Sequence, residues 1–133
     1  MRRMFSLVLG AACAVQSWAA LASPSLLIGT WGGEHVGIAF RGGLAEVKFD
    51  CAAGSIDEPV YPAKDGSFTA RGTFRRGSPG PVKVGQIYHS EPATYSGTVQ
   101  KHVMTLSVDL EDGSKGGPFI LTENASPQLT RCL

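Results

Sequence analysis

The chain of 133 residues has little cysteine, almost no net charge and no long apolar run. Its formal net charge is +1, which gives no basis for binding nucleic acid or an anionic membrane surface, since both favour a strong basic excess. No stretch reaches the about 20 apolar residues that a membrane-spanning helix needs. Apolar residues also never recur at helical spacing over three turns, which argues against a helical domain.

Residues 1–22 have the pattern of a cleaved signal peptide. Arg2-Arg3 gives a positive start, the stretch from Phe5 to Ala20 is mostly apolar, and Ala20-Leu21-Ala22 supplies small residues for the peptidase. We therefore expect an exported protein, periplasmic or secreted, whose mature chain is one domain over residues 23–133 without a transmembrane segment. Removing the two arginines makes the mature chain slightly acidic.

Two other interpretations of the leader stay open. Leu9-Gly10-Ala11-Ala12-Cys13 resembles a lipoprotein box, in which Cys13 would carry the lipid anchor. Arg2-Arg3-Met4-Phe5 resembles part of a twin-arginine signal. Both alternatives lead to export as well.

The mature chain has two cysteines, Cys51 and Cys132. An even count in an oxidising compartment favours one disulfide between them. Closing such a long loop stabilises a fold by roughly 4 kcal/mol in the chain-entropy model. Two free thiols or a pair of metal ligands are the alternatives.

Apolar residues alternate with period two along most of the mature chain, which is typical of half-buried strands. Seventeen glycines and eight prolines punctuate these segments. The alternation predicts strands over 27–31, 34–40, 44–51, 68–75, 95–100, 104–110 and 119–122, with a short one over 82–87. Residues 52–66, 88–92 and 111–117 are expected to be irregular links.

Short neighbouring strands joined by tight turns predict an all-β antiparallel meander. Closing about seven or eight of them into an up-and-down barrel removes the exposed edges. A two-sheet β-sandwich is the alternative.

Gly29-Thr30-Trp31 resembles the Gly-x-Trp start of lipocalins and avidins, which are small up-and-down barrels. That resemblance implies a basic residue, here Arg131, packed over Trp31. Trp31-Gly32-Gly33-Glu34-His35, Phe49-Asp50-Cys51-Ala52 and Tyr95-Ser96-Gly97 resemble a group of uncharacterised exported bacterial proteins. The size and the disulfide near the C-terminus also resemble small exported inhibitors of lysozymes and proteases.

Glu34 and His35 form the best local candidate for chemistry, because His titrates near neutrality and two glycines precede the pair. Adjacent residues of a strand point to opposite faces, so both enter one site only if the chain bends there. A rim glutamate beside a surface histidine is the simpler interpretation. His35, His89 and His102 lack metal-ligand spacing, so no metal or other cofactor is expected.

Trp31, Tyr61, Tyr88 and Tyr95 are candidates to line the mouth of the barrel, since aromatic residues with polar tips suit ligand pockets and interfaces. Packing in the core or at the rim is the alternative. No motif for nucleophilic catalysis is found, and no catalytic residue is assigned.

The sequence thus predicts an exported, non-enzymatic binding module. Its partner would be a small apolar molecule inside the barrel or an extracytoplasmic protein at the rim. The alternatives are an inhibitor of an extracellular enzyme, with residues 77–92 as a protruding loop, and a small hydrolase or metal-dependent enzyme that uses Glu34 and His35.

Overall fold

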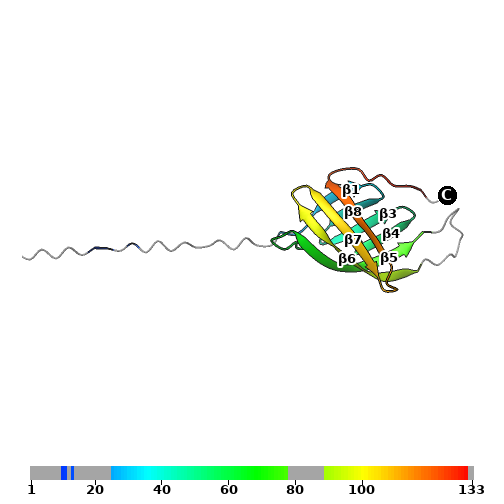
Figure 1. Cartoon of the computed structure of the whole chain (residues 1–133), viewed down its shortest axis with the longest axis horizontal. Coiled ribbons are helices and arrows are strands. Elements are labelled where there is room, and N and C mark those ends of the chain that lie inside the picture. The colour runs from blue at the N-terminus through cyan, green and yellow to red at the C-terminus, as the bar shows by residue number, and fades with distance from the viewer. Residues whose placement is uncertain (1–9, 12, 14–24, 78–88, 132–133) are drawn as a thin grey trace, which may run out of the picture.

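The computed structural model describes residues 10, 11, 13, 25–77 and 89–131. This part of the chain contains eight strands and no helix, arranged as a barrel (Figure 1). In chain order the strands are β1 (Gly29–Gly33), β2 (Val36–Arg41), β3 (Leu44–Phe49), β4 (Ala52–Ile56), β5 (Ser67–Arg76), β6 (Ser90–Gln100), β7 (Val103–Leu110) and β8 (Lys115–Glu123).

Each strand pairs antiparallel with the next, and β1 pairs with β8 to close the ring. At the closure Trp31 lies opposite Glu123 and Gly33 opposite Leu121. The predicted all-β, up-and-down barrel is therefore confirmed, and the sandwich alternative is wrong. Closure leaves none of these strands with an unpaired edge, the feature that promotes aggregation in open sheets.

β4 is the strand that the alternation pattern missed, since residues 52–66 were expected to be irregular. Ala52-Ala53-Gly54-Ser55 has no apolar side chain large enough to produce a pattern, yet it pairs along its length with β3 and β5. The neighbouring strands impose its extended form. β6 and β8 also begin earlier than predicted, and the strand predicted over 82–87 lies outside the described residues.

Inward-facing apolar side chains from all eight strands form the core. Tyr95, Ile56, Met104, Leu106, Leu121, Val36 and Val47 are the largest fully buried ones. The Tyr95 hydroxyl donates a hydrogen bond of 2.7 Å to the backbone oxygen of Thr73. Burial raises the pKa of Tyr95, and the negative charge of Asp57 raises it further, so this phenol stays a donor at neutral pH.

Gly54 on β4 makes room for the tip of Tyr95. A Cβ atom at Gly54 would lie 2.1 Å from the Tyr95 hydroxyl oxygen and 2.5 Å from the Thr73 backbone oxygen. Only glycine therefore permits this close packing between β4, β5 and the Tyr95 ring.

The two ends of the barrel differ. One end, which we call the mouth, holds the β1–β2 turn, the β3–β4 turn, the start of β6 and the β7–β8 turn at residues 111–114. The opposite end, the base, holds the β2–β3 turn, the link 57–66 and the β6–β7 turn. At the base the Leu27 N–H donates to the Val60 oxygen at 2.8 Å, and both side chains are buried. The base is therefore capped by its own loop.

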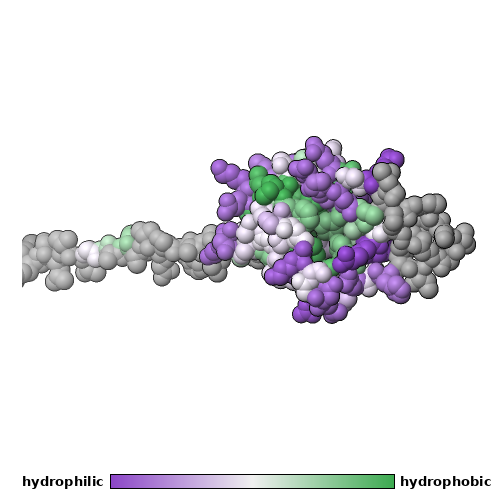
Figure 2. Space-filling view, turned by 45° about the vertical axis from the view of Figure 1, so that its right-hand side comes forward, coloured by the Kyte–Doolittle hydropathy of each residue, from purple (hydrophilic) through white to green (hydrophobic). Residues whose placement is uncertain are grey.

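The outer surface is mixed, with hydrophilic side chains beside hydrophobic ones on the face seen in Figure 2. Ile28 and Ile120 are the most exposed large apolar side chains of the described residues, at 65% and 59%. In the described part of the chain, no helix has the length and apolar character needed to cross a membrane.

We predict that Gly54→Ala lowers the free energy of unfolding by about 1–3 kcal/mol, because the added methyl group overpacks the interior against Tyr95. Tyr95→Phe alone costs about 1 kcal/mol for the lost hydrogen bond. Removing the hydroxyl relieves part of the clash, so Gly54→Ala should cost less in the Tyr95→Phe background. Urea unfolding of the four proteins measures this coupling, and strictly additive effects would contradict the contact.

Candidate functional site: the mouth cavity

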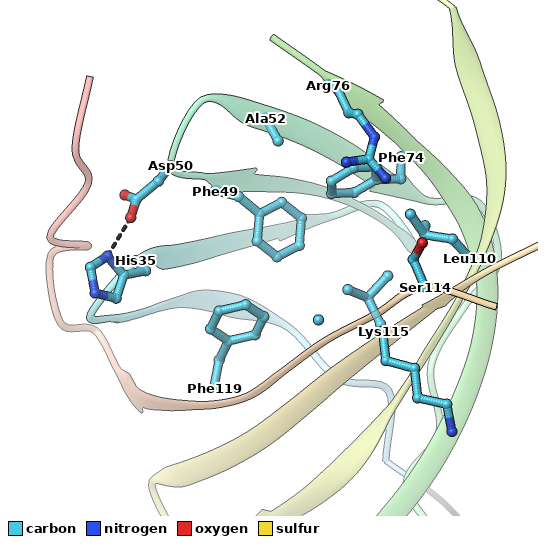
Figure 3. Close-up of a pocket in the computed structure, with 12 residues that line it drawn as sticks. His35, Phe49, Asp50, Ala52, Phe74, Arg76, Leu110, Ser114, Lys115 and Phe119 are labelled. Carbon is cyan, nitrogen blue, oxygen red and sulfur yellow. Dashed lines mark hydrogen bonds and ion pairs between the residues drawn. The ribbon is translucent and has the colours of Figure 1, made fainter. Parts of the chain in front are cut away.

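A hollow with a volume of ≈ 490 Å³ lies at the mouth (Figure 3). Its walls come from five strands, β3, β4, β5, β7 and β8, and from three turns at the mouth. The lining residues are His35, Phe49, Asp50, Ala52, Phe74, Arg76, Val108, Leu110, Ser114, Lys115, Gly116 and Phe119. The inner wall is apolar and the charged groups lie at the rim.

Three phenyl rings dominate this cavity. The Phe49 ring lies between those of Phe74 and Phe119, with centroids 5.5 Å and 5.6 Å apart and interplanar angles of 57° and 50°. Tilted rings at such distances are the preferred aromatic arrangement. Phe49 is buried, whereas Phe74 and Phe119 are only partly covered by the core. The phenyl cluster therefore presents apolar surface to the cavity.

Arg76 lies above this cluster on the side of β5. Its guanidinium carbon is 5.8 Å from the centroid of the Phe74 ring, within the range of a cation–π contact. Its Nε atom is 3.8 Å from an Oε1 atom of Glu91, and the Arg76 side chain is 65% exposed. The rim thus carries a cation beside the aromatic wall.

His35 and Asp50 form a hydrogen-bonded pair at the opposite side of the rim, between Nδ1 and Oδ2 (Figure 3). His35 has a φ of 70°, so the chain bends in the β1–β2 turn and is not extended there. The His35 Nε2 atom consequently lies 3.4 Å from Glu34 Oε1. The condition set by the sequence, a bend that brings Glu34 and His35 together, is met.

The C-terminal strap, residues 124–131, returns from β8 along the outer side of β1 (Figure 1). The Gln128 N–H donates to Gly33 O at 3.0 Å, and the His35 N–H donates to Gln128 O at 2.8 Å. Farther along, the Thr130 N–H donates to Asp50 Oδ1 at 2.6 Å. Asp50 therefore holds the strap with one oxygen and His35 with the other.

Two glycines of β1 and β2 allow the strap to pack closely against these strands. A Cβ atom at Gly32 would come within 2.2 Å of the Ala125 oxygen, and one at Gly37 within 2.8 Å of the Pro127 ring. The two glycines are paired across β1 and β2. Within Trp31-Gly32-Gly33, the Trp31 side chain therefore packs in the core, and Gly32 leaves room for the strap on the outer face.

Trp31 is 3% exposed and points into the barrel, where its Nε1–H donates to the Ile28 oxygen at 3.2 Å. Arg131 is exposed and follows Thr130, which is tied to Asp50 at the mouth. Among the described residues, no cation–π contact joins Arg131 to Trp31. Trp31 is a core residue and does not line the mouth cavity.

The tyrosines expected at the mouth lie elsewhere. Tyr95 is fully buried, and Tyr61 is 53% exposed in the β4–β5 link at the base. Tyr88 lies outside the described residues. Of the five candidate ligand-binding residues that the structure describes, His35 is the one that lines the cavity.

Cys51 follows Asp50 in the β3–β4 turn, and Cys132 lies outside the described residues. The disulfide between them stays a prediction. The bond between Thr130 and Asp50 brings the strap beside this turn two residues before Cys132, as such a pairing requires.

The residues that sequence reasoning missed are the phenyl cluster and Arg76. The alternation of apolar residues places Phe49 and Phe74 on the inward faces of their strands, but it does not indicate which end of the barrel they occupy. In an up-and-down meander odd strands end where even strands begin, so the ends of β3 and β5 and the start of β8 meet at one end. The number of strands before each residue would therefore have shown that the three phenylalanines lie at the same end.

His102 is paired with Glu123 at 2.9 Å, in the β6–β7 turn at the base, far from His35 at the mouth. Within the described residues, no group of three or more His, Cys, Asp or Glu side chains gathers as a metal site requires.

No protein-family model, no curated protein and no solved structure matches the chain. The resemblance to lipocalins and avidins therefore stays a prediction beyond the shared barrel shape.

We predict that Asp50→Ala releases the end of the strap at Thr130 without opening the barrel. The Thr130 amide loses its acceptor and should exchange its hydrogen with solvent much faster, while amides of the β5–β6–β7 ladder keep their protection. The loss in unfolding free energy should be about 1 kcal/mol. Hydrogen exchange followed by NMR measures both effects.

Asp65→Ala is the matched control, because Asp65 accepts an equivalent bond from the Ser67 N–H at the base. It should leave Thr130 exchange unchanged. Equal Thr130 exchange in Asp50→Ala and the wild type would show that Asp50 does not hold the strap.

Proposed function

We propose that the mature chain, from Ser23 onward, is an exported, non-enzymatic binding module that holds a small apolar molecule in its mouth cavity. The observation that carries this proposal is the volume of ≈ 490 Å³ enclosed by three phenyl rings at one open end of the barrel. Small-molecule sites are typically concave, mostly apolar and about 300–1,000 Å³ in volume.

The distribution of burial supports a ligand at this end. Ala52, Phe74, Leu110 and Phe119 line the cavity and are only partly covered by the rest of the core. Covering such surface releases water and contributes about 0.8 kcal/mol for each buried methylene group of a ligand. A small apolar molecule at the mouth would complete the burial that the side chains leave unfinished.

Export and the disulfide belong to the same proposal. A leader over residues 1–22 would place the barrel outside the cytosol, where Cys51 and Cys132 can pair. Pairing would fix the end of the strap to the rim formed by Asp50 and His35. The binding site and the C-terminus would then be joined covalently.

The two protein-binding alternatives receive less support. The inhibitor hypothesis rests on residues 77–92, of which 78–88 lie outside the described residues. Among the described residues, Leu129 of the strap is the one exposed large apolar side chain near the rim, which offers a protein partner little apolar surface beyond the cavity. We therefore prefer a small molecule.

We predict that Ala52→Trp abolishes or weakens binding of a neutral apolar fluorophore, N-phenylnaphthylamine, at least tenfold. Ala52 faces the cavity, so a large ring there fills the space. Ala53→Trp is the matched control, because the next residue of β4 points to the outer face. Fluorescence titration of the wild type and both variants measures the affinities.

The proposal fails if the wild type shows no saturable binding of this probe. It also fails if Ala52→Trp and Ala53→Trp bind it equally well, because the probe would then lie outside the mouth cavity.

A second candidate, a small hydrolase, is favoured by one specific observation. Glu34, His35 and Asp50 lie together beside a concave site, and a histidine oriented by a carboxylate is the usual form of a general base. Ser114 is the one hydroxyl among the described lining residues, and it lies across the cavity from His35 (Figure 3). Within the described lining, the pair therefore has no hydroxyl beside it, and it would have to activate water.

Hydrolysis of p-nitrophenyl esters separates the two candidates. A binding module should release p-nitrophenol no faster than a His35→Gln variant does. Repeated turnover that is lost in His35→Gln, while fluorophore binding persists, would establish the hydrolase instead.

A further inference from the structure

We infer that the mouth cavity selects an organic anion, with a carboxylate or similar acidic group bound by Arg76 and an apolar body lying on the phenyl cluster of Phe49, Phe74 and Phe119. This inference rests on the proposed function and adds the chemical class of the ligand. It follows from the position of the Arg76 guanidinium and from the hydrogen bonds and ion pairs that the other charged groups around the mouth make.

Arg76 is placed to receive an acidic group. Its guanidinium lies over the Phe74 ring, where a ligand with its body on the phenyl cluster would end (Figure 3). Its one ion pair among the described residues is the contact of 3.8 Å from Nε to Glu91, beyond hydrogen-bond length. The terminal nitrogens therefore remain as a planar pair of donors, the geometry that binds carboxylates in bidentate fashion.

The acidic groups at the mouth are mostly committed to other partners. Asp50 uses one oxygen for His35 and the other for the Thr130 N–H. Asp112, in the β7–β8 turn, accepts the Ser114 N–H at 2.8 Å. Glu34 lies against His35. Hydrogen bonds from Ser114 lower the pKa of Asp112, and the charge of Arg76 lowers it further. Glu91 and Glu111 make no hydrogen bond among the described residues. Selection of an anion therefore depends on the terminal nitrogens of Arg76, which make no hydrogen bond in the described part of the chain.

Lys115 adds a second positive charge to the lining, although its ammonium group points away from the phenyl rings (Figure 3). Among the described residues it has no ion pair. It lies on the same side of the cavity as Arg76, opposite to the Asp50–His35 pair, with Asp109 as its cross-strand partner. The ligand is thus oriented, with its acidic end toward β5 and β8 and its body across Phe49.

The test compares three probes that share one alkyl chain: decanoate, decanol and decyltrimethylammonium. Displacement of N-phenylnaphthylamine from the mature protein at pH 7.5 gives their affinities. We expect decanoate to bind more tightly than decanol, and decyltrimethylammonium to bind most weakly. In Arg76→Gln, decanoate binding should weaken about three- to tenfold, as for a partly exposed charged hydrogen bond, while decanol binding stays the same.

Arg71→Gln is the matched control, since it removes the same charge from the outer face of the same strand and should leave all three affinities unchanged. The inference is overturned if decanoate binds no more tightly than decanol to the wild type, or if Arg76→Gln weakens both probes equally. Failure of every probe, including the neutral fluorophore, would instead overturn the proposed function on which the inference rests.

Discussion

The inside of an eight-stranded barrel is just wide enough for side chains to fill it or for one small ligand to enter it. This dimension governs the whole molecule. In the base half, Tyr95, Ile56, Met104 and Leu121 are fully buried and fill the space. Gly54 accommodates the tip of the Tyr95 ring, which reaches over β5 to β4.

Toward the mouth the same width is not filled. Some inward positions there carry the small residues Ala52 and Gly116, and others carry the three tilted phenyl rings. Small residues next to large ones leave the volume of ≈ 490 Å³. The cavity is therefore a consequence of which residues stand at the ends of β3, β5 and β7 and at the starts of β4 and β8.

The rim connects this cavity to the C-terminal strap. His35 and Asp50 line the mouth, and both also hold the strap, through the backbone of Gln128 and of Thr130. Gly32 and Gly37 allow the strap to lie close on β1 and β2. The position of the strap and the shape of the rim are thus set by the same hydrogen bonds, and a pairing of Cys51 with Cys132 would reinforce them.

The barrel was predictable because period-two alternation is strong in β2, β3, β5 and β7. β4 was not, since small residues carry no alternation and its form depends on its neighbours. For the site, His35 was found from its chemistry, whereas Tyr61 and Tyr95 were expected at the mouth and lie at the base and in the core. Which end a residue occupies depends on the number of strands that precede it. Because β4 was not predicted, that number was uncertain for every later residue.

The central claim is that an apolar ligand lies on the phenyl cluster inside the mouth. Isotope-filtered NMR of the labelled mature protein with unlabelled decanol tests it most directly. The account predicts nuclear Overhauser contacts between the alkyl chain and the rings of Phe49, Phe74 and Phe119. Contacts to outward side chains such as Ile28 or Ile120 at saturation, with none to these rings, would contradict it.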